Sequence, residues 1–218
     1  MDYALTRPDR FTLAERDTGK IFRGGDQDWF RDVWQRRAGC GPTTAAMVLD
    51  YLSSVHPRLT ALGAAGERTT ADFLAYMEVL WTYVTPGTMG LDKPESFALG
   101  CRSFALSRGM VLESRILTVP RKGKGDRPDL DQVRIFLTWA LDGDSPVAFL
   151  NYSNGDVKNL DSWHWVPIIS YSGKEKELAV TVLDGGEEKM VDLALWLETS
   201  LLGGAFVRVY PDPAVYQA

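Results

Sequence analysis

Cys40 is the residue of this chain best suited to covalent chemistry, because it stands at the start of a predicted helix between two glycines. A thiolate is a strong nucleophile and a thiol a weak one, and the positive end of a helix dipole favours the thiolate. Gly39 and Gly41 leave room for an incoming carbonyl group, and Pro42 suits the first turn of a helix, where its missing N–H is no loss. The alternative interpretation is a cysteine that is simply buried at a helix start.

His164 is the candidate proton-transfer partner, and it is one of only two histidines in the chain. It stands near the start of an apolar segment, 163–171, that is predicted to be a strand. A second predicted strand, 178–184, ends at Asp184 before the turn Gly185-Gly186. If the two strands pair as neighbours, the start of the first lies beside the end of the second, and His164 meets Asp184 at one edge of the sheet. A carboxylate there would fix the imidazole tautomer and stabilise its positive charge.

Asp184 also has a purely structural interpretation, since Asp-Gly-Gly is a strong hairpin turn signal by itself. Asp161, three residues before the histidine, is the reserve candidate for the carboxylate. Trp163 and Trp165 flank the histidine on the predicted strand. Because side chains alternate along a strand, both are expected to point to the face opposite His164 and to pack in the core.

The motif around Cys40 and the later His-Trp-Val run together resemble the papain-like cysteine peptidases. They resemble in particular the bacterial branch related to the double-glycine peptidase domain that trims leader peptides from bacteriocins. In that branch Gly-Cys-Gly-Pro-Thr followed by Ala-Ala-Met-Val-Leu marks the nucleophile helix, and a His-Trp-Val run and a later strand ending in Asp mark the other two members. The resemblance covers about residues 35–51 and 162–197.

This resemblance implies a papain-like fold, with an N-terminal helical half packed against a C-terminal antiparallel sheet, and a triad of Cys40, His164 and Asp184. It also implies a glutamine shortly before the cysteine that helps to build the oxyanion hole, and Gln35 fits that role. Relatives often carry glycine directly before the histidine, whereas this chain has Trp163, whose indole would narrow the cleft. The implied activity is cleavage of a peptide or other amide bond through an acyl-enzyme on Cys40.

The pattern of elements predicts an α+β fold, because helices come first along the chain and strands come later. Residues 1–34 are expected to be irregular, apart from a turn at Gly24-Gly25-Asp26. Apolar periodicity, proline and capping residues predict helices at about 42–56, 70–84, 94–107, 129–141 and 192–201. Strands are predicted at about 110–119, 146–152, 163–171, 178–184, 187–191 and 205–210.

Composition limits the function classes. A chain of 218 residues with 45% hydrophobic content can bury one sizeable core, so we expect a single domain over 1–218. The net charge of −5 disfavours a nucleic-acid binder. Two cysteines make no disulfide framework, and the N-terminus lacks the apolar stretch of a secretory signal, so we expect a cytoplasmic protein. No uncharged apolar run approaches the length of a membrane span.

Three function classes remain open. The first is a thiol hydrolase acting on a peptide or amide substrate, and the second is an acyltransferase or transpeptidase that uses the same thiol chemistry. The third is a peptide-binding module without activity. The spacing of Cys40, Cys101, His56 and His164 matches no zinc motif, so we expect no metal or cofactor, and we expect a monomer. Cys101 falls on an apolar helical stripe and is expected in the core.

Overall fold

The computed structural model describes residues 2–216, which form a seven-stranded sheet, a separate two-stranded hairpin and a set of helices. The strand order in the large sheet is β4-β9-β5-β6-β7-β8, with β1 added beside β6, and the pairings are antiparallel. These strands are β1 (Tyr3–Ala4), β4 (Leu112–Val119), β5 (Val147–Asn151), β6 (His164–Ser172), β7 (Ala179–Asp184), β8 (Glu187–Asp192) and β9 (Gly204–Pro211). The mixture of helices and antiparallel sheet agrees with the predicted α+β class.

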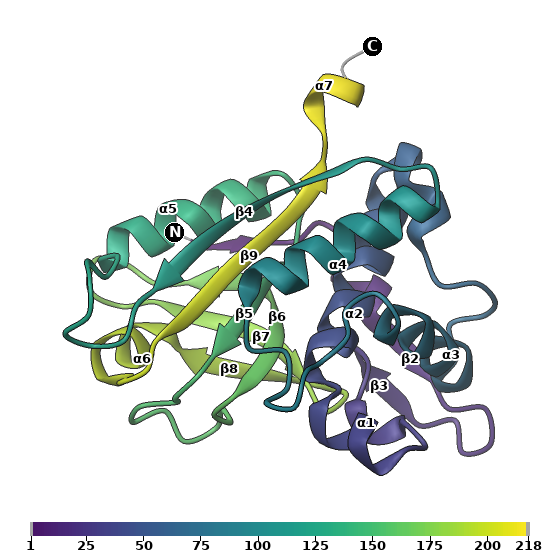
Figure 1. Ribbon diagram of the computed structural model, residues 1–218, viewed down its shortest axis with the longest axis horizontal. Helices are drawn as coiled ribbons and strands as arrows, with labels where there is room; N and C mark the ends of the chain where they lie inside the picture. The colour runs from purple at the N-terminus through teal and green to yellow at the C-terminus, as the bar shows by residue number, and fades with distance from the viewer. Residues whose placement is uncertain (1, 217–218) are drawn as a thin grey trace.

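The helices gather around the two sides of this sheet. The α-helices are α1 (Val33–Ala38), α2 (Cys40–Val55), α3 (Thr70–Trp81), α4 (Pro94–Ser107), α5 (Leu130–Asp142), α6 (Leu193–Thr199) and α7 (Pro213–Tyr216), and the short 3-10 helices are η1 (Pro8–Phe11), η2 (Gln27–Trp29) and η3 (Pro57–Leu62). Helices α1, α2 and α3 lie on one side of the molecule with the hairpin of β2 (Thr12–Ala14) and β3 (Ile21–Arg23), while α5 and α6 lie with the sheet on the other (Figure 1). Within residues 2–216, no helix combines the length and apolar composition that a bilayer crossing requires.

Helix α2 is the most deeply placed helix of the molecule, since its residues from Cys40 to Leu52 are all buried. It packs against β5 and β6 on one side and against α3 on another. A helix that is covered all round lies inside a core, which is why its small residues Ala45 and Ala46 are fully enclosed. It ends at Val55, and His56 before Pro57 has extended angles, as the sequence predicts, because the residue before a proline avoids helical angles.

The centre of the sheet is covered on both faces, since every residue of β5 is buried. Phe149 of β5 stacks on Phe206 of β9 with ring centroids 5.0 Å apart, and it meets the edge of Trp196 from α6 at 4.7 Å. These rings fix strands β5 and β9 in the middle of the core. The catalytic candidates lie farther along the sheet, on β6 and β7.

Strands β6 and β7 pair as neighbours, which confirms the prediction on which the histidine and aspartate placement rests. Ile168 lies opposite Val182, and Ser172 lies opposite Ala179. The start of β6 therefore lies beside the end of β7. Gly185 and Gly186 both have positive φ, 61° and 75°, in the two-residue turn that leads into β8. Antiparallel strands joined by two such residues form a tight hairpin, so the end of β7 is held in place.

The expectation of an irregular segment over 1–34 is wrong. This segment contains β1, the β2–β3 hairpin, η1 and η2, and residues 33–38 form helix α1. Its strands are two or three residues long, too short to show an alternating pattern in the sequence. The backbone N–H of Arg23 donates to the carbonyl of Gly186, so this segment is anchored to the hairpin that follows β7.

The remaining predicted elements are present with shifted ends. Helix α3 ends at Trp81, not at Val84, because residues 82–84 form turns. Strand β6 begins at His164, and Trp163 lies outside it with a φ of 55°. The prediction that Trp163 packs in the core is therefore wrong: it is 51% exposed and rests on the ring of Tyr152. Trp165 is buried as predicted and stacks on Phe97.

Gly24 and Gly19 provide a matched test of how tightly the N-terminal segment is packed. Both have positive φ, 86° and 69°, but a Cβ on Gly24 would lie 2.6 Å from the Met47 sulfur, whereas one on Gly19 would meet nothing within 4 Å. We expect Gly19→Ala to cost about 1 kcal/mol of unfolding free energy from backbone strain alone. Gly24→Ala adds overpacking and should cost about 2–4 kcal/mol. Equal urea-unfolding losses for the two variants would contradict the packing of this turn on α2.

Candidate active site

Cys40 is the first residue of α2 and is 8% exposed. Helix α1 ends immediately before it, and Gly39 joins the two helices with ordinary right-handed angles, φ −80° and ψ −5°. A Cβ on Gly39 would lie 2.4 Å from the Gln35 carbonyl oxygen, and one on Gly41 would lie 2.6 Å from Leu91. The two glycines therefore allow close packing on either side of the cysteine, a different reason from the open approach that the sequence suggested.

His164 and Asp184 are joined by a hydrogen bond of 2.8 Å between Nε2 and Oδ1. Each side chain is only 13% exposed. The Cys40 thiol is close enough to the same imidazole to raise its pKa. Because Nε2 faces the carboxylate, Nδ1 is the nitrogen left for the thiol. The structure thus brings Cys40, His164 and Asp184 together in the order that the sequence predicts.

Lys189 is a fourth member of this cluster that the sequence analysis missed. Its Nζ lies 2.8 Å from Oδ2 of Asp184, so both carboxylate oxygens are occupied, one by the histidine and one by the lysine. The hairpin sequence does contain a signal for this contact. Asp184 pairs with Glu187 across the turn, and residue 189 is the next side chain on that same face. A basic residue at that position can reach the carboxylate diagonally.

The charges of this cluster stabilise one another. Burial lowers the pKa of His164, but the hydrogen bond that its ring donates to Asp184 and the interaction with Cys40 outweigh burial and raise the pKa to about 10. Burial raises the pKa of Asp184, but His164 and Lys189 outweigh it and hold the pKa at about 2. At neutral pH the site therefore contains an imidazolium and a carboxylate, and the imidazolium is the form that can stabilise a thiolate and donate a proton.

These shifts also set the pH range in which the pair stabilises the fold. The pKa of Asp184 falls from 3.8 to about 2 on folding, so its contribution is present above about pH 4 and is lost as the pH falls toward 2. The pKa of His164 rises from 6.5 to about 10, so its contribution is complete below pH 6.5 and is lost as the pH rises through 10. The two ranges overlap in mildly acidic solution, where the pair stabilises the fold fully.

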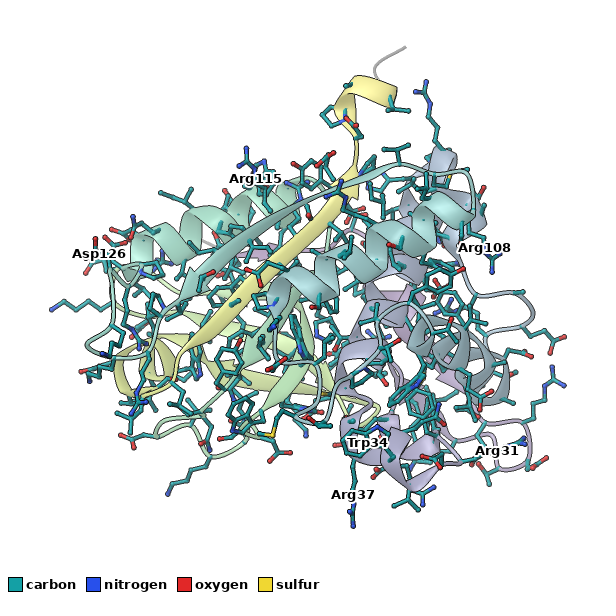
Figure 2. The ribbon with its side chains drawn as sticks, in the orientation of Figure 1. Arg31, Trp34, Arg37, Arg108, Arg115 and Asp126 are labelled. Atoms are coloured by element: carbon teal, nitrogen blue, oxygen red, sulfur yellow. The ribbon has the colours of Figure 1, made fainter. Side chains whose placement is uncertain are left out.

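Two cavities meet at Cys40. The first, called the polar cavity below, has a volume of about 200 Å³ and is lined by His164, Asp184, Lys189, the segment 25–28 and two threonines of α2. The second, called the apolar cavity, has a volume of about 290 Å³ and lies between α1 and the loop 88–91, with Trp34 and Trp163 in its wall. Trp34 and Arg37 of α1 project at the edge of the molecule beside it (Figure 2). A substrate that crosses Cys40 would enter one cavity on each side.

Gln35 does not line either of these cavities. It lies on α1, where its backbone N–H donates to the capping carboxylate of Asp32. Gln27 lines the polar cavity with Cys40 instead, and its Nε2 donates to the Arg36 carbonyl at 2.8 Å. That bond uses one of the two N–H groups of the amide. No motif at Gln27 signals this position, because its placement depends on the fold of the N-terminal segment.

The other residues considered from the sequence lie as follows. The reserve candidate Asp161 lines the polar cavity, but Asp184 is the carboxylate bonded to the histidine. Cys101 is fully buried, as predicted, and burial raises its pKa. His56 ends α2, and burial lowers its pKa. Neither of these two lines the cavities at Cys40.

Comparisons with known proteins add little. No protein-family model and no curated protein sequence matches this chain. Among solved structures, the chain is similar to the crystal structure of the Pseudomonas avirulence protein AvrPphB, with a TM-score of 0.32 and 14% sequence identity, over 93% of this chain and 98% of that one. At this level of likeness the function must be argued from the site itself. The relation to bacteriocin-leader peptidases stays a hypothesis.

The two histidines make the charge state of the site directly measurable. We expect two separate imidazole titrations by NMR, one below pH 6.5 for His56 and one near pH 10 for His164. In Asp184→Asn the upper titration should move down toward 6.5, because a neutral amide no longer stabilises the imidazolium. The His56 titration should stay where it is and serves as the internal control. An upper titration that is unmoved in Asp184→Asn would mean that the aspartate does not govern the histidine.

Proposed function

We propose that this protein is a thiol-dependent hydrolase with a papain-like arrangement, which cleaves a peptide or other amide bond through an acyl-enzyme on Cys40. One observation carries the proposal: a cysteine at a helix start shares an imidazole with a buried carboxylate, which lies 2.8 Å from the far ring nitrogen. That arrangement is suited to nucleophilic catalysis, because it supplies a nucleophile, a proton carrier and a group that orients the carrier.

In the first half of the reaction the Cys40 thiolate attacks the substrate carbonyl carbon and forms a C–S bond. The carbonyl oxygen becomes an oxyanion. His164 then gives its Nδ1 proton to the leaving amine, the C–N bond breaks, and a thioester remains on Cys40. In the second half the neutral imidazole takes a proton from water, the resulting hydroxide displaces the thiolate, and the carboxylic acid product leaves. Asp184 orients the ring throughout and stabilises its charged form.

The oxyanion needs donors that are already in position. The Cys40 backbone N–H is one candidate, because the first N–H groups of a helix have no partner within the helix. Gln35 was the second candidate from the sequence. The lining of the polar cavity favours Gln27 instead, because its Nε2 keeps one N–H after bonding the Arg36 carbonyl.

The acyltransferase reading uses the same steps with an amine or thiol in place of water. Nothing in the site distinguishes the two acceptors, so hydrolysis is tested by the products. The non-catalytic function is the weaker alternative, because a peptide-binding surface has no need of an imidazolium–carboxylate pair beside a cysteine. A cytoplasmic, monomeric protein remains our prediction.

Thiol reactivity tests the proposal without knowledge of the substrate. With limiting iodoacetamide at pH 6, we expect rapid and selective modification of Cys40 over the buried Cys101, read by peptide mass spectrometry. His164→Ala should slow this modification at least tenfold, since the imidazolium no longer stabilises the thiolate. Cleavage of a proteome-derived peptide library should be detectable for the wild type and absent for Cys40→Ala. A thiol no more reactive than free cysteine, together with an uncleaved library, would refute the hydrolase.

Comparing alanine substitutions of Gln27 and Gln35 tests which glutamine is the oxyanion donor. We expect Gln27→Ala to lower turnover by about a hundredfold to a thousandfold, the usual loss on removing one such donor. Gln35→Ala should stay near the wild-type rate. Neither variant should change the rate of alkylation by iodoacetamide, because that reaction forms no oxyanion. The opposite ranking of the two variants would return the role to Gln35.

A further inference from the structure

The polar cavity carries more negative charge than the triad requires. Three carboxylates besides Asp184 line it: Asp26, Asp28 and Asp161. The one lysine in its wall, Lys189, is already bound to Asp184 at 2.8 Å. Lys189 also acts electrostatically on Asp26 and Asp161, so the four carboxylates of the cavity share a single lysine.

The carboxylates are close enough to influence one another. Burial raises the pKa of Asp26, and the nearby charges of Asp28 and Asp184 raise it further, while the hydrogen bond from the Asp28 backbone N–H and the charge of Lys189 act in the opposite direction. Asp28 and Asp161 are exposed, whereas Asp26 is half-buried. A positive group in this space would relieve the mutual repulsion.

A second, independent feature points to a ligand with N–H donors. Thr43 and Thr44 line the same cavity, and the hydroxyls of both are buried without a hydrogen-bond partner in the protein. These residues are only 4% and 0% exposed. The Oε1 atom of Gln27 is also buried without a partner. Unpaired buried acceptors are costly, so their gathering in one cavity indicates that a bound group satisfies them.

The chemistry of the proposed reaction assigns this cavity to one side of the scissile bond. His164 must give its proton to the leaving amine, so the leaving portion has to lie beside the imidazole. Cys40 lines both cavities, but His164 lines the polar cavity and not the apolar one. The leaving portion therefore occupies the polar cavity, and the acyl portion occupies the apolar one.

We propose that the polar cavity is a subsite for a cationic group on the leaving portion of the substrate, namely the ammonium or guanidinium of a lysine or arginine next to the scissile bond. This inference rests on the proposed hydrolase function and names its substrate class. A volume of about 200 Å³ suits one long side chain and lies below the range of about 300–1,000 Å³ that is usual for whole small molecules. Among the described residues no three acidic, histidine or cysteine side chains are grouped to hold a metal ion, so the expected cation is organic.

Charged thiol reagents test the cavity without any substrate. Methanethiosulfonates with aminoethyl, methyl and sulfonatoethyl groups carry positive, zero and negative charge and share one leaving group. Each transfers its thioalkyl group to the Cys40 thiolate, forming a disulfide and releasing methanesulfinate. We expect the wild type to react faster with the cationic reagent than with the anionic one. In the combined Asp26→Asn, Asp28→Asn, Asp161→Asn variant this rate ratio should fall about tenfold at low salt, and 0.5 M salt should reduce the ratio in the wild type.

Asp126→Asn is the distant control, because it makes the same kind of substitution, with the loss of one negative charge against three in the combined variant, at a loop far from Trp34 and Arg37, which border the apolar cavity (Figure 2). Its rate ratio should change less than twofold. Asparagine keeps the size of aspartate and can still cap η2 from position 26, and a circular dichroism melt checks that the combined variant folds. A ratio that is the same in the combined variant and the wild type overturns the subsite.

The peptide library then assigns the subsite to the leaving side. Cleavage products of the wild type should be enriched in lysine or arginine at the first leaving-side position, and the combined variant should lose that preference about tenfold. Cleavage without any basic preference in the wild type overturns the inference while the hydrolase stands. If no peptide is cleaved, the reagent ratio alone decides whether the cavity selects cations, and the hydrolase proposal fails if the thiol is also no more reactive than free cysteine.

Discussion

The 2.8 Å hydrogen bond between His164 and Asp184 is the interaction on which the site depends, and it exists because two antiparallel strands meet with opposite ends together. Neither side chain alone fixes the imidazole. The hairpin turn after β7 holds the carboxylate at the sheet edge, and Lys189 on the returning strand occupies its second oxygen. With Lys189 on Oδ2, the other carboxylate oxygen, Oδ1, bonds Nε2 of the histidine and fixes the orientation of the ring.

The nucleophile reaches this edge through a different kind of constraint. Helix α2 is enclosed by sheet and helices, so packing holds the helix start that carries Cys40. Glycines on both sides of it let the neighbouring segments approach without a Cβ in the way. The site therefore joins a polar, hydrogen-bonded half on the sheet to a tightly packed half on the helix. The two cavities differ in the same way, since carboxylates line one and mainly apolar residues line the other.

Much of this arrangement was readable from the sequence. The cysteine helix, the histidine strand and the strand that ends at Asp184 carry strong local signals of periodicity, capping and turn chemistry, and their pairing followed from those signals. Gln27, Lys189 and the N-terminal strands were missed for physical reasons. Strands of two or three residues show no period. The position of Gln27 depends on contacts between segments far apart in the chain, such as the hydrogen bond from the Arg23 N–H to the Gly186 carbonyl. Gln35, chosen for its spacing from the cysteine, lies outside both cavities.

Trp165 has a consequence for how this protein could be redesigned. Its indole N–H donates to the Leu91 carbonyl, and Leu91 packs against Gly41, directly beside the nucleophile. The residue after the histidine and the residue after the cysteine are thereby braced through the same loop, 88–91, that walls the apolar cavity. Directed evolution that reshapes this loop to admit a new acyl group would also disturb the spacing between thiol and imidazole. Selectivity for the acyl group and reaction rate therefore depend on the same contacts, and substitutions around Trp165 should arise that restore the spacing between thiol and imidazole.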